Sequence, residues 1–257
     1  MSYPINYPTP QGANVQIFNC NTDATVQVTL QTWVKPQGAN MVWFTLIGAG
    51  GQGGGTDGIA NWSGGGSGAV TNLMIPAFLI PDILHVWVGN GGSGAGPGAD
   101  GNNGAQTVVQ NPSSSNNILI AMGGNGGTNT GGAGGTAMTA NFFTAAGFFQ
   151  SMAGDSGSLS GGTAPAGTFL NGGGVGTAQT ANYGYSNGRA AGDGGVGYFQ
   201  MSPIMIGVGG NGNVGSGSGA GSYKGGIGCG GGGSSNNLGS PYAGNPGGNG
   251  LAVIITW

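Results

Sequence analysis

The chain alternates short apolar blocks with tracts dominated by glycine. Residues 14–18 and 25–30 alternate polar and apolar side chains, which is the two-residue period of a half-buried β-strand. Other blocks are runs of β-branched and aromatic residues bounded by glycine, proline or asparagine, as is typical of strands. These blocks span residues 41–47, 83–88, 106–110, 117–122 and 251–257. Because no block reaches the length of an ordinary helix, the pattern predicts an all-β sandwich or barrel.

The glycine tracts between the blocks allow two physical states. The main tracts are residues 48–68, 89–104, 123–135 and 207–250, and their glycines do not recur at every third position, which excludes collagen. They are either flexible linkers or closely packed extended helices of the polyproline II type, with three residues per turn. We favour partly packed loops, because the interleaved Asn, Ser and Thr side chains satisfy backbone groups. The predicted fold is a jelly-roll-like β-sandwich with long glycine-rich loops. Packing of some glycine tracts as polyglycine-II-type segments is retained as the alternative.

The amino-acid composition at first suggests disorder, but the distribution of apolar residues along the chain favours a folded domain. Glycine supplies 65 of 257 residues and proline 12, a composition typical of disorder when apolar residues are also diluted. Here the apolar residues are concentrated in blocks that can bury a core, and the formal net charge is only -3. Three Lys and Arg residues are too few to displace counterions from phosphates, so nucleic-acid binding is excluded.

The N-terminal residues and the cysteines bear on location. Residues 1–20 contain no cationic region followed by an apolar stretch, so we expect no signal peptide and synthesis in a cytoplasm. The longest apolar stretch, residues 73–88, is interrupted by two prolines, an aspartate and a histidine, so no transmembrane segment is expected. Cys20 and Cys229 have no metal or redox spacing, and two free thiols are favoured over a disulfide.

Motifs that suggest catalysis lack the partners that catalysis needs. Gly48, Gly50 and Gly53 match a dinucleotide fingerprint, but neither a following helix nor an acidic residue at the required distance is present. The segment 154–157 (GDSG) resembles the nucleophile region of chymotrypsin-like proteases, but the single histidine, His85, falls in a predicted strand. Six scattered Asp and no Glu favour neither paired-carboxylate hydrolysis nor a metal cluster. We therefore predict no catalytic, cofactor or metal site, and no enzyme activity.

Aromatic side chains gather in two blocks in the middle of the chain, residues 136–152 and 182–206. A second small core or a subunit interface is the favoured interpretation, because contiguous exposed apolar patches are uncommon. The alternative is an exposed aromatic loop that binds a receptor. The candidate residues for contact with a receptor or partner are Phe142, Phe143, Phe148, Phe149, Tyr183, Tyr185, Arg189 and Tyr223.

The order of landmarks resembles the glycine-rich domain of bacteriophage tail-fibre, adhesin and other virion-associated proteins. The landmarks are WVKPQGA at 33–39 leading into MVWFTLIGAGGQGGG, HVWVGNGG at 85–92, IAMGGNGG at 120–127, CGGGGSS at 229–235 and GNPGGNGLAVIITW at 244–257. The resemblance implies that the first and last strands of the domain lie close together in one sheet. It also implies that glycine-rich loops at one end present receptor-contacting residues. The aromatic blocks depart from the landmark pattern.

These observations lead to a hypothesis about organisation and function. Residues 1–32 are predicted to hold N-terminal strands and an attachment segment, and residues 33–257 a glycine-rich β-sandwich domain with an aromatic-bearing insertion at 136–206. The expected function is that of a non-enzymatic structural virion protein, of spike or fibre-tip type, that contributes to host attachment. The expected partners are other virion proteins, further copies of the chain and a host receptor that is a glycan or a protein. The alternatives are a minor capsid or cement protein and, less favoured, an extracellular ice-binding or matrix protein.

Overall fold

A computed structural model describes residues 13–20, 28–57, 62–113, 117–154, 156–157, 200–201, 204–205, 213–214, 225–235 and 243–257. Two antiparallel sheets dominate these residues and form a sandwich, which confirms the all-β prediction. The five-stranded sheet has the order β1 (Asn14–Asn19), β13 (Leu251–Thr256), β3 (Met41–Ile47), β4 (Val70–Pro76) and β8 (Phe148–Met152). The four-stranded sheet has the order β2 (Val28–Val34), β5 (Ile83–Gly89), β6 (Thr107–Gln110) and β7 (Asn117–Ala121).

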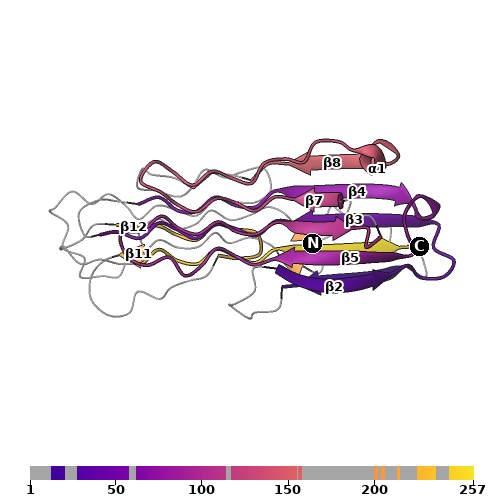
Figure 1. The fold of residues 1–257 in the computed structure, drawn as a ribbon, viewed down its shortest axis with the longest axis horizontal. Coiled ribbons are helices and arrows are strands. Elements are labelled where there is room, and N and C mark those ends of the chain that lie inside the picture. Colours follow the sequence, from indigo (N-terminus) through magenta and orange to yellow (C-terminus); the bar gives the residue numbers. More distant parts are fainter. Residues whose placement is uncertain are drawn as a thin grey trace, which may run out of the picture.

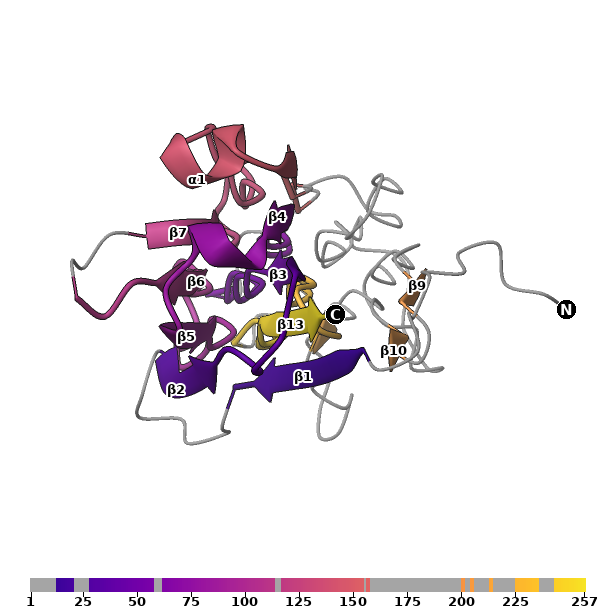
Figure 2. The same ribbon diagram turned by 90° about the vertical axis from the view of Figure 1, so that its right-hand side faces the viewer.

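The smaller elements lie outside the sandwich sheets. A 3-10 turn, η1 (Ala77–Leu79), follows β4, and the short helix α1 (Phe142–Ala145) precedes β8. The remaining strands form two-residue pairs, β9 (Gln200–Met201) with β10 (Ile204–Met205) and β11 (Asn213–Val214) with β12 (Ser234–Ser235). Figure 2 looks along the molecule and shows the two sheets as facing layers, with α1 beside β7.

Alternating side chains of the two sheets meet in one core. On β3, Val42, Phe44 and Leu46 are fully buried, and on β5 the buried side chains are Leu84, Val86 and Val88. The rings of Trp33 and Phe44 meet edge to face with their centroids 6.2 Å apart. This two-residue alternation is the period expected when one face of each strand covers a common core.

The register places the last strand of the chain beside an early one, as the resemblance implied. β13 lies between β1 and β3 and pairs with both in antiparallel fashion, with Ile254 opposite Gln16 on one side and Phe44 on the other. The predicted block 41–47 coincides with β3. The second predicted strand, 25–30, is shifted, since β2 spans Val28–Val34 and residues 25–27 lie outside the described residues.

Two strands of the larger sheet were not predicted. β4 carries the polar residues Thr71 and Asn72 and ends at Pro76, so its composition does not stand out from the flanking loops. It pairs with β3 along its whole length, and β8 adds to its other edge. In both cases a neighbouring strand supplies the hydrogen-bond partners, which local composition does not reveal.

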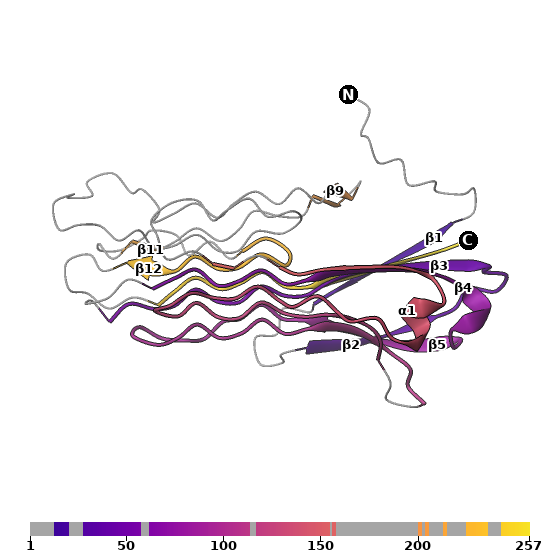
Figure 3. The same ribbon diagram turned by 90° about the horizontal axis from the view of Figure 1, so that it is seen from above.

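The described glycine tracts continue from one end of the sandwich as a bundle of extended segments that lie side by side (Figures 1 and 3). We call this bundle the glycine rod, and it comprises the described residues of 48–57, 62–69, 90–106, 122–135, 225–235 and 243–250. Trp257 lies at the opposite end of the sandwich (Figure 1). The described part of the molecule is therefore elongated, with side-chain packing at one end and glycine at the other.

The N–H groups of the central tract, residues 48–55, point to three different neighbours in turn. Every third N–H donates to the same neighbouring tract, with N to O distances of 2.8–3.1 Å. Gly48, Gly51 and Gly54 donate to the carbonyls of Ala69, Gly66 and Ser63, respectively. Ala49, Gln52 and Gly55 donate to those of Ala105, Asn102 and Ala99, and Gly50 and Gly53 donate to those of Gly248 and Asn245. A repeat of three residues per turn is that of the polyproline II helix.

The carbonyl groups of the same tract point to three further stretches of chain. Ala49 and Gln52 accept hydrogen bonds from Gly124 and Gly127, Gly51 and Gly54 accept from Gly231 and Ser234, and Gly50 accepts from Gly92. The central tract is thus bonded to six surrounding stretches, which fixes it laterally in every direction. Of the two states that the sequence left open, the described tracts adopt the packed one, and they are more regular than the partly packed loops that we favoured.

Glycine is required where these tracts approach each other. A Cβ atom built on Gly50 or Gly51 would lie under 3.0 Å from the carbonyl oxygens of Cys229 and Asn125, respectively. Such contacts are not tolerated by rigid backbone, so any side chain at these positions would force the tracts apart.

One long side chain is accommodated inside the rod. Gln52 is 2 % exposed, and its amide nitrogen donates to the carbonyls of Ala95 (3.0 Å) and Gly244 (3.2 Å). Its amide oxygen accepts from the N–H groups of Ala95 (2.9 Å) and Asn102 (3.4 Å). The Gln52 side chain therefore joins three tracts with hydrogen bonds that the backbone alone does not make.

Candidate contact surfaces

The first group of candidate contact residues lies on α1 and β8, at the sandwich end of the molecule (Figure 1). Asn141 caps the helix, because its side-chain oxygen accepts from the N–H of Thr144 (3.0 Å) and the Thr144 hydroxyl accepts from the N–H of Asn141 (2.6 Å). The Asn141 amide nitrogen also donates to the carbonyls of Asn117 and Ile118. These bonds hold α1 against β7.

Within this group, each pair of adjacent phenylalanines is divided between surface and core. Phe142 is 79 % exposed and Phe148 is 65 % exposed. Phe143 and Phe149 are half-buried and pack against the sandwich core. The rings of Phe142 and Phe143 lie edge to face, with centroids 5.6 Å apart. Phe142 and Phe148 are therefore the two phenylalanines of this group that face solvent.

The other candidates, Tyr183, Tyr185, Arg189 and Tyr223, lie outside the described residues, and so does Asp155 of the GDSG segment. The aromatic insertion predicted at 136–206 is described at 136–154, 156–157, 200–201 and 204–205.

Phe148 is one end of a line of apolar side chains that crosses the five-stranded sheet on its outer face. Strand register places Val15 opposite Ile255, Ile255 opposite Trp43, Trp43 opposite Met74 and Met74 opposite Phe148. We call these five residues the apolar row. Val15 is 49 % exposed, and Ile255, Trp43 and Met74 are half-buried. Large apolar side chains at adjacent positions on an outer face are typical of a surface that contacts another protein.

Nearer the rod, the same outer face is covered by the chain itself. Ile47, Val70 and Leu251 are buried in a small cluster with Cys229, and Ile227 packs against it. The tract 225–230 thus shields one end of the outer face, and the apolar row borders this covered cluster through Ile255, which packs against it.

Our sequence interpretation selected Phe148 but missed the rest of the apolar row. The signal was present in the blocks 41–47 and 251–257, which are apolar at consecutive positions instead of alternating. A strand with that pattern is apolar on both faces, and one of those faces points away from the core. The five strands of this sheet carry no Asp, Glu, Lys or Arg, so they contribute no charged side chain to the face around the row.

The far end of the rod presents polar turns. Gly94 and Gly98 adopt positive φ angles of 90° and 72° where the chain reverses between two tracts. In another turn, the Thr128 hydroxyl accepts from the N–H groups of Thr130 (3.0 Å) and Gly131 (3.1 Å). The turns therefore offer backbone and hydroxyl groups held in a fixed conformation.

The described residues contain no group of three His, Cys, Asp or Glu side chains that could hold a metal ion. His85 lies on β5, as predicted. The Gly48, Gly50 and Gly53 motif lies in the glycine rod, and the described residues after it, 54–57 and 62–69, form no helix. Cys20 and Cys229 are both buried and are not joined by a disulfide. No helix in the described part of the chain is long and apolar enough to cross a membrane.

A family model matches most of the chain, including its glycine-rich tracts. The model described as "Glycine-rich domain" matches residues 24–257. The chain belongs to this glycine-rich domain family. The match begins just before β2 and extends through β13, so it includes most of the sandwich and all of the rod. No curated protein sequence is significantly similar to the chain.

Proposed function

We propose that this glycine-rich domain protein is a non-enzymatic structural component of a virus particle, of spike or fibre-tip type, that contributes to host attachment. The observation that carries the proposal is the apolar row on the outer face of the five-stranded sheet, whose strands carry no charged side chain. Burial of Val15, Met74 and Phe148 against a neighbouring subunit would remove apolar surface from water without the cost of desolvating charges. The neighbours are other virion proteins or further copies of the chain.

The glycine rod supports the attachment part of the proposal. Its backbone hydrogen bonds make it stiff, and it holds the turns at 94–98 and 128–131 away from the sandwich (Figure 3). If the sandwich end is seated on the particle, these turns project toward the host. Their hydroxyl and backbone groups suit a glycan or a polar protein loop, recognised through shape and hydrogen bonding instead of charge. The resemblance to tail-fibre and adhesin domains agrees with this orientation.

The strongest alternative is a minor capsid or cement protein, and the exposure of Phe142 and Phe148 favours it. Phe148 ends the apolar row at β8, and the exposed Phe142 on the preceding helix would extend a subunit contact around the edge of the sheet. In a cement protein, neighbouring subunits would cover both the sandwich end and the rod. In a spike, only the sandwich end would be covered.

The proposal is tested on particles of the encoding virus. Purified particles should contain the protein, and limited labelling of intact particles should modify the rod turns but not the apolar row. Particles with Thr130→Ala should adsorb to host cells more slowly, while Phe148→Ala should reduce incorporation of the protein into particles. Phe78→Ala is the matched control, since Phe78 on η1 is 83 % exposed but lies outside α1 and β8.

The outcomes separate the alternatives. Absence of the protein from particles would remove the virion role altogether. Intact particles that contain the Thr130→Ala protein and adsorb normally would contradict attachment through this turn. Protection of both the rod turns and the apolar row from labelling would establish the cement alternative instead.

A further inference from the structure

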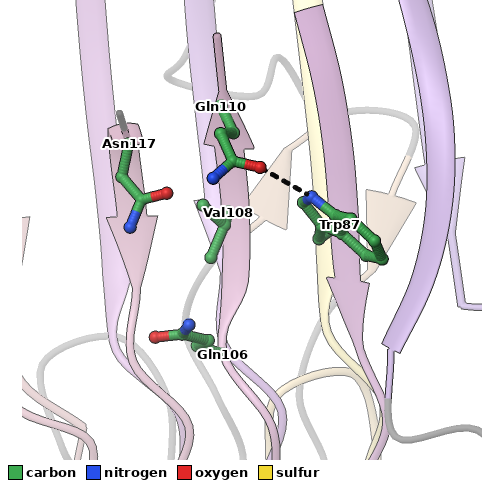
Figure 4. A pocket seen from close by; sticks show the side chains of 5 residues that line it. All are labelled: Trp87, Gln106, Val108, Gln110 and Asn117. Carbon is green, nitrogen blue, oxygen red and sulfur yellow. Dashed lines mark hydrogen bonds between the residues drawn. The ribbon is translucent and has the colours of Figure 1, made fainter. Parts of the chain in front are cut away.

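A shallow depression of about 360 Å³ lies on the outer face of the four-stranded sheet, on the opposite side of the sandwich from the apolar row. Its lining residues come from three adjacent strands and the residue before β6 (Figure 4), namely Trp87, Gln106, Val108, Gln110 and Asn117. Register places Trp87 opposite Val108 and Gln110 opposite Asn117. The volume falls at the lower end of the range of about 300–1,000 Å³ for small-molecule sites.

The indole ring of Trp87 is held in a defined orientation on one side of the depression. Its Nε1–H donates to the side-chain oxygen of Gln110 at 3.3 Å, and Figure 4 shows the two side chains directed toward each other across adjacent strands. Trp87 is half-buried, so part of the ring faces solvent. A ring that is already oriented loses little conformational entropy when a ligand stacks on it.

The floor and rim of the depression have complementary chemistry. Val108 is 5 % exposed and supplies an apolar floor. The rim carries the amides of Gln106 and Asn117, and each amide offers one acceptor oxygen and two donor hydrogens. The Asn117 carbonyl accepts a bond from the Asn141 side chain, which helps to fix the position of β7. None of the described residues that line the depression is Asp, Glu, Lys or Arg, so they suit an uncharged ligand.

We propose that this depression binds a neutral saccharide. A pyranose ring presents a face of C–H groups, which stacks on the electron-rich face of an aromatic ring, and hydroxyl groups at its edge, which both donate and accept hydrogen bonds. Trp87 supplies the stacking surface, Val108 the apolar floor, and Gln106 and Asn117 the hydrogen-bonding edge. Because every lining group is uncharged, acidic sugars gain no ion pair there and bind no better than neutral ones. This site is separate from the apolar row and the rod turns, so it does not rest on the proposed function.

The experiment uses the purified full chain and the methyl glycosides of glucose, galactose, mannose and N-acetylglucosamine, with sialic acid as the acidic probe. Binding is followed through the NMR signal of the Trp87 indole N–H, assigned by its loss in Trp87→Phe. We expect at least one neutral glycoside to shift this signal in a saturable manner. Loss of one neutral hydrogen bond costs about three- to tenfold in affinity, so Asn117→Ala and Gln106→Ala should each weaken binding by that factor.

Controls distinguish a specific site from a general effect. Gln150→Ala removes an exposed amide from β8 on the other sheet and should bind as the unaltered chain does. Gln106 is exposed and precedes β6, so its substitution should leave folding intact even if Asn117→Ala disturbs β7. The proposal is overturned if no neutral glycoside shifts the Trp87 signal, if sialic acid binds more tightly than every neutral probe, or if Gln106→Ala binds with unchanged affinity.

Discussion

The sandwich and the glycine rod bury polypeptide backbone in two different ways. In the sandwich, each strand pairs with at most two neighbours in its sheet, and side chains such as Phe44 and Leu84 fill the space between the sheets. In the rod, the tract 48–55 is bonded to six stretches of chain and the backbones themselves fill the space. The comparison shows that a bundle can be packed without a side-chain core, provided that hydrogen bonds radiate in every direction and nothing protrudes between the tracts.

The two regions should therefore respond differently to substitution. Side-chain cores tolerate swaps that keep volume and lose stability when atoms are removed. The rod tolerates nothing larger than hydrogen at its close contacts and loses stability when atoms are added. Both responses can be measured in one protein by hydrogen exchange, with β3 reporting on the sandwich and the central tract reporting on the rod.

The largest effect is expected for Phe44→Ala in the sandwich core. Phe44 is fully buried and contacts Trp33, so its truncation leaves a cavity that should lower the free energy of unfolding by about 3–5 kcal/mol. Chemical denaturation followed by tryptophan fluorescence measures this change. Hydrogen exchange should accelerate in β3 and in the rod together if the rod needs the sandwich as its base. Exchange that accelerates in β3 alone would show that the rod is stable by itself.

The opposite change, which adds one methyl group to the rod, should cause a smaller loss of stability. Gly51→Ala places a Cβ against the Asn125 carbonyl and should cost about 1–3 kcal/mol, with faster exchange of the amides of 48–55 and little change in β5. Gly96→Ala is the matched control, because a Cβ there meets no atom within 4 Å. Equal effects of the two substitutions would mean that close backbone contact is not what stabilises the rod.

Removal of the Gln52 side chain from the rod should have a more modest effect. Gln52→Ala leaves the Ala95 backbone groups and the Gly244 carbonyl without their side-chain partner, and we expect a loss of about 1–2 kcal/mol. Exchange at Ala95 should accelerate more than exchange at Gly66, which is bonded by backbone alone. Gln150→Ala, on the exposed side of β8, should leave both rates unchanged.

The smallest effect concerns the described ion pair at the sandwich end. Lys35 Nζ lies 2.8 Å from a carboxylate oxygen of Asp82, and Asp82 is 86 % exposed. Because solvent screens this pair, Asp82→Asn should change the free energy of unfolding by less than about 1 kcal/mol. Lys35→Ala should cost more, since Lys35 Nζ also donates to the Ile80 carbonyl at 2.7 Å. A larger loss with Asp82→Asn would reveal an electrostatic contribution that its exposure does not suggest.

The sequence predicted the sandwich better than it predicted the candidate contact surfaces. The block 41–47 became β3 without change, because its apolar and aromatic residues favour a strand in any context. β4 was missed because its strand character depends on pairing with β3 and β8. Phe142 and Phe148 were chosen together with Phe143 and Phe149, and only the packing of α1 and β8 separates the exposed pair from the half-buried pair.

By itself, the sequence determined the all-β class, the low charge and the scarcity of residues for acid-base or metal chemistry, because these follow from residue type and short-range order. The tertiary structure alone decided the state of the glycine tracts and the presence of the apolar row. The hydrogen-bond partners of residues 48–55 lie between positions 63 and 248, and no local pattern links such distant segments. The apolar row exists because strand register aligns one residue from each of five strands, and register is a property of paired strands, not of any one of them.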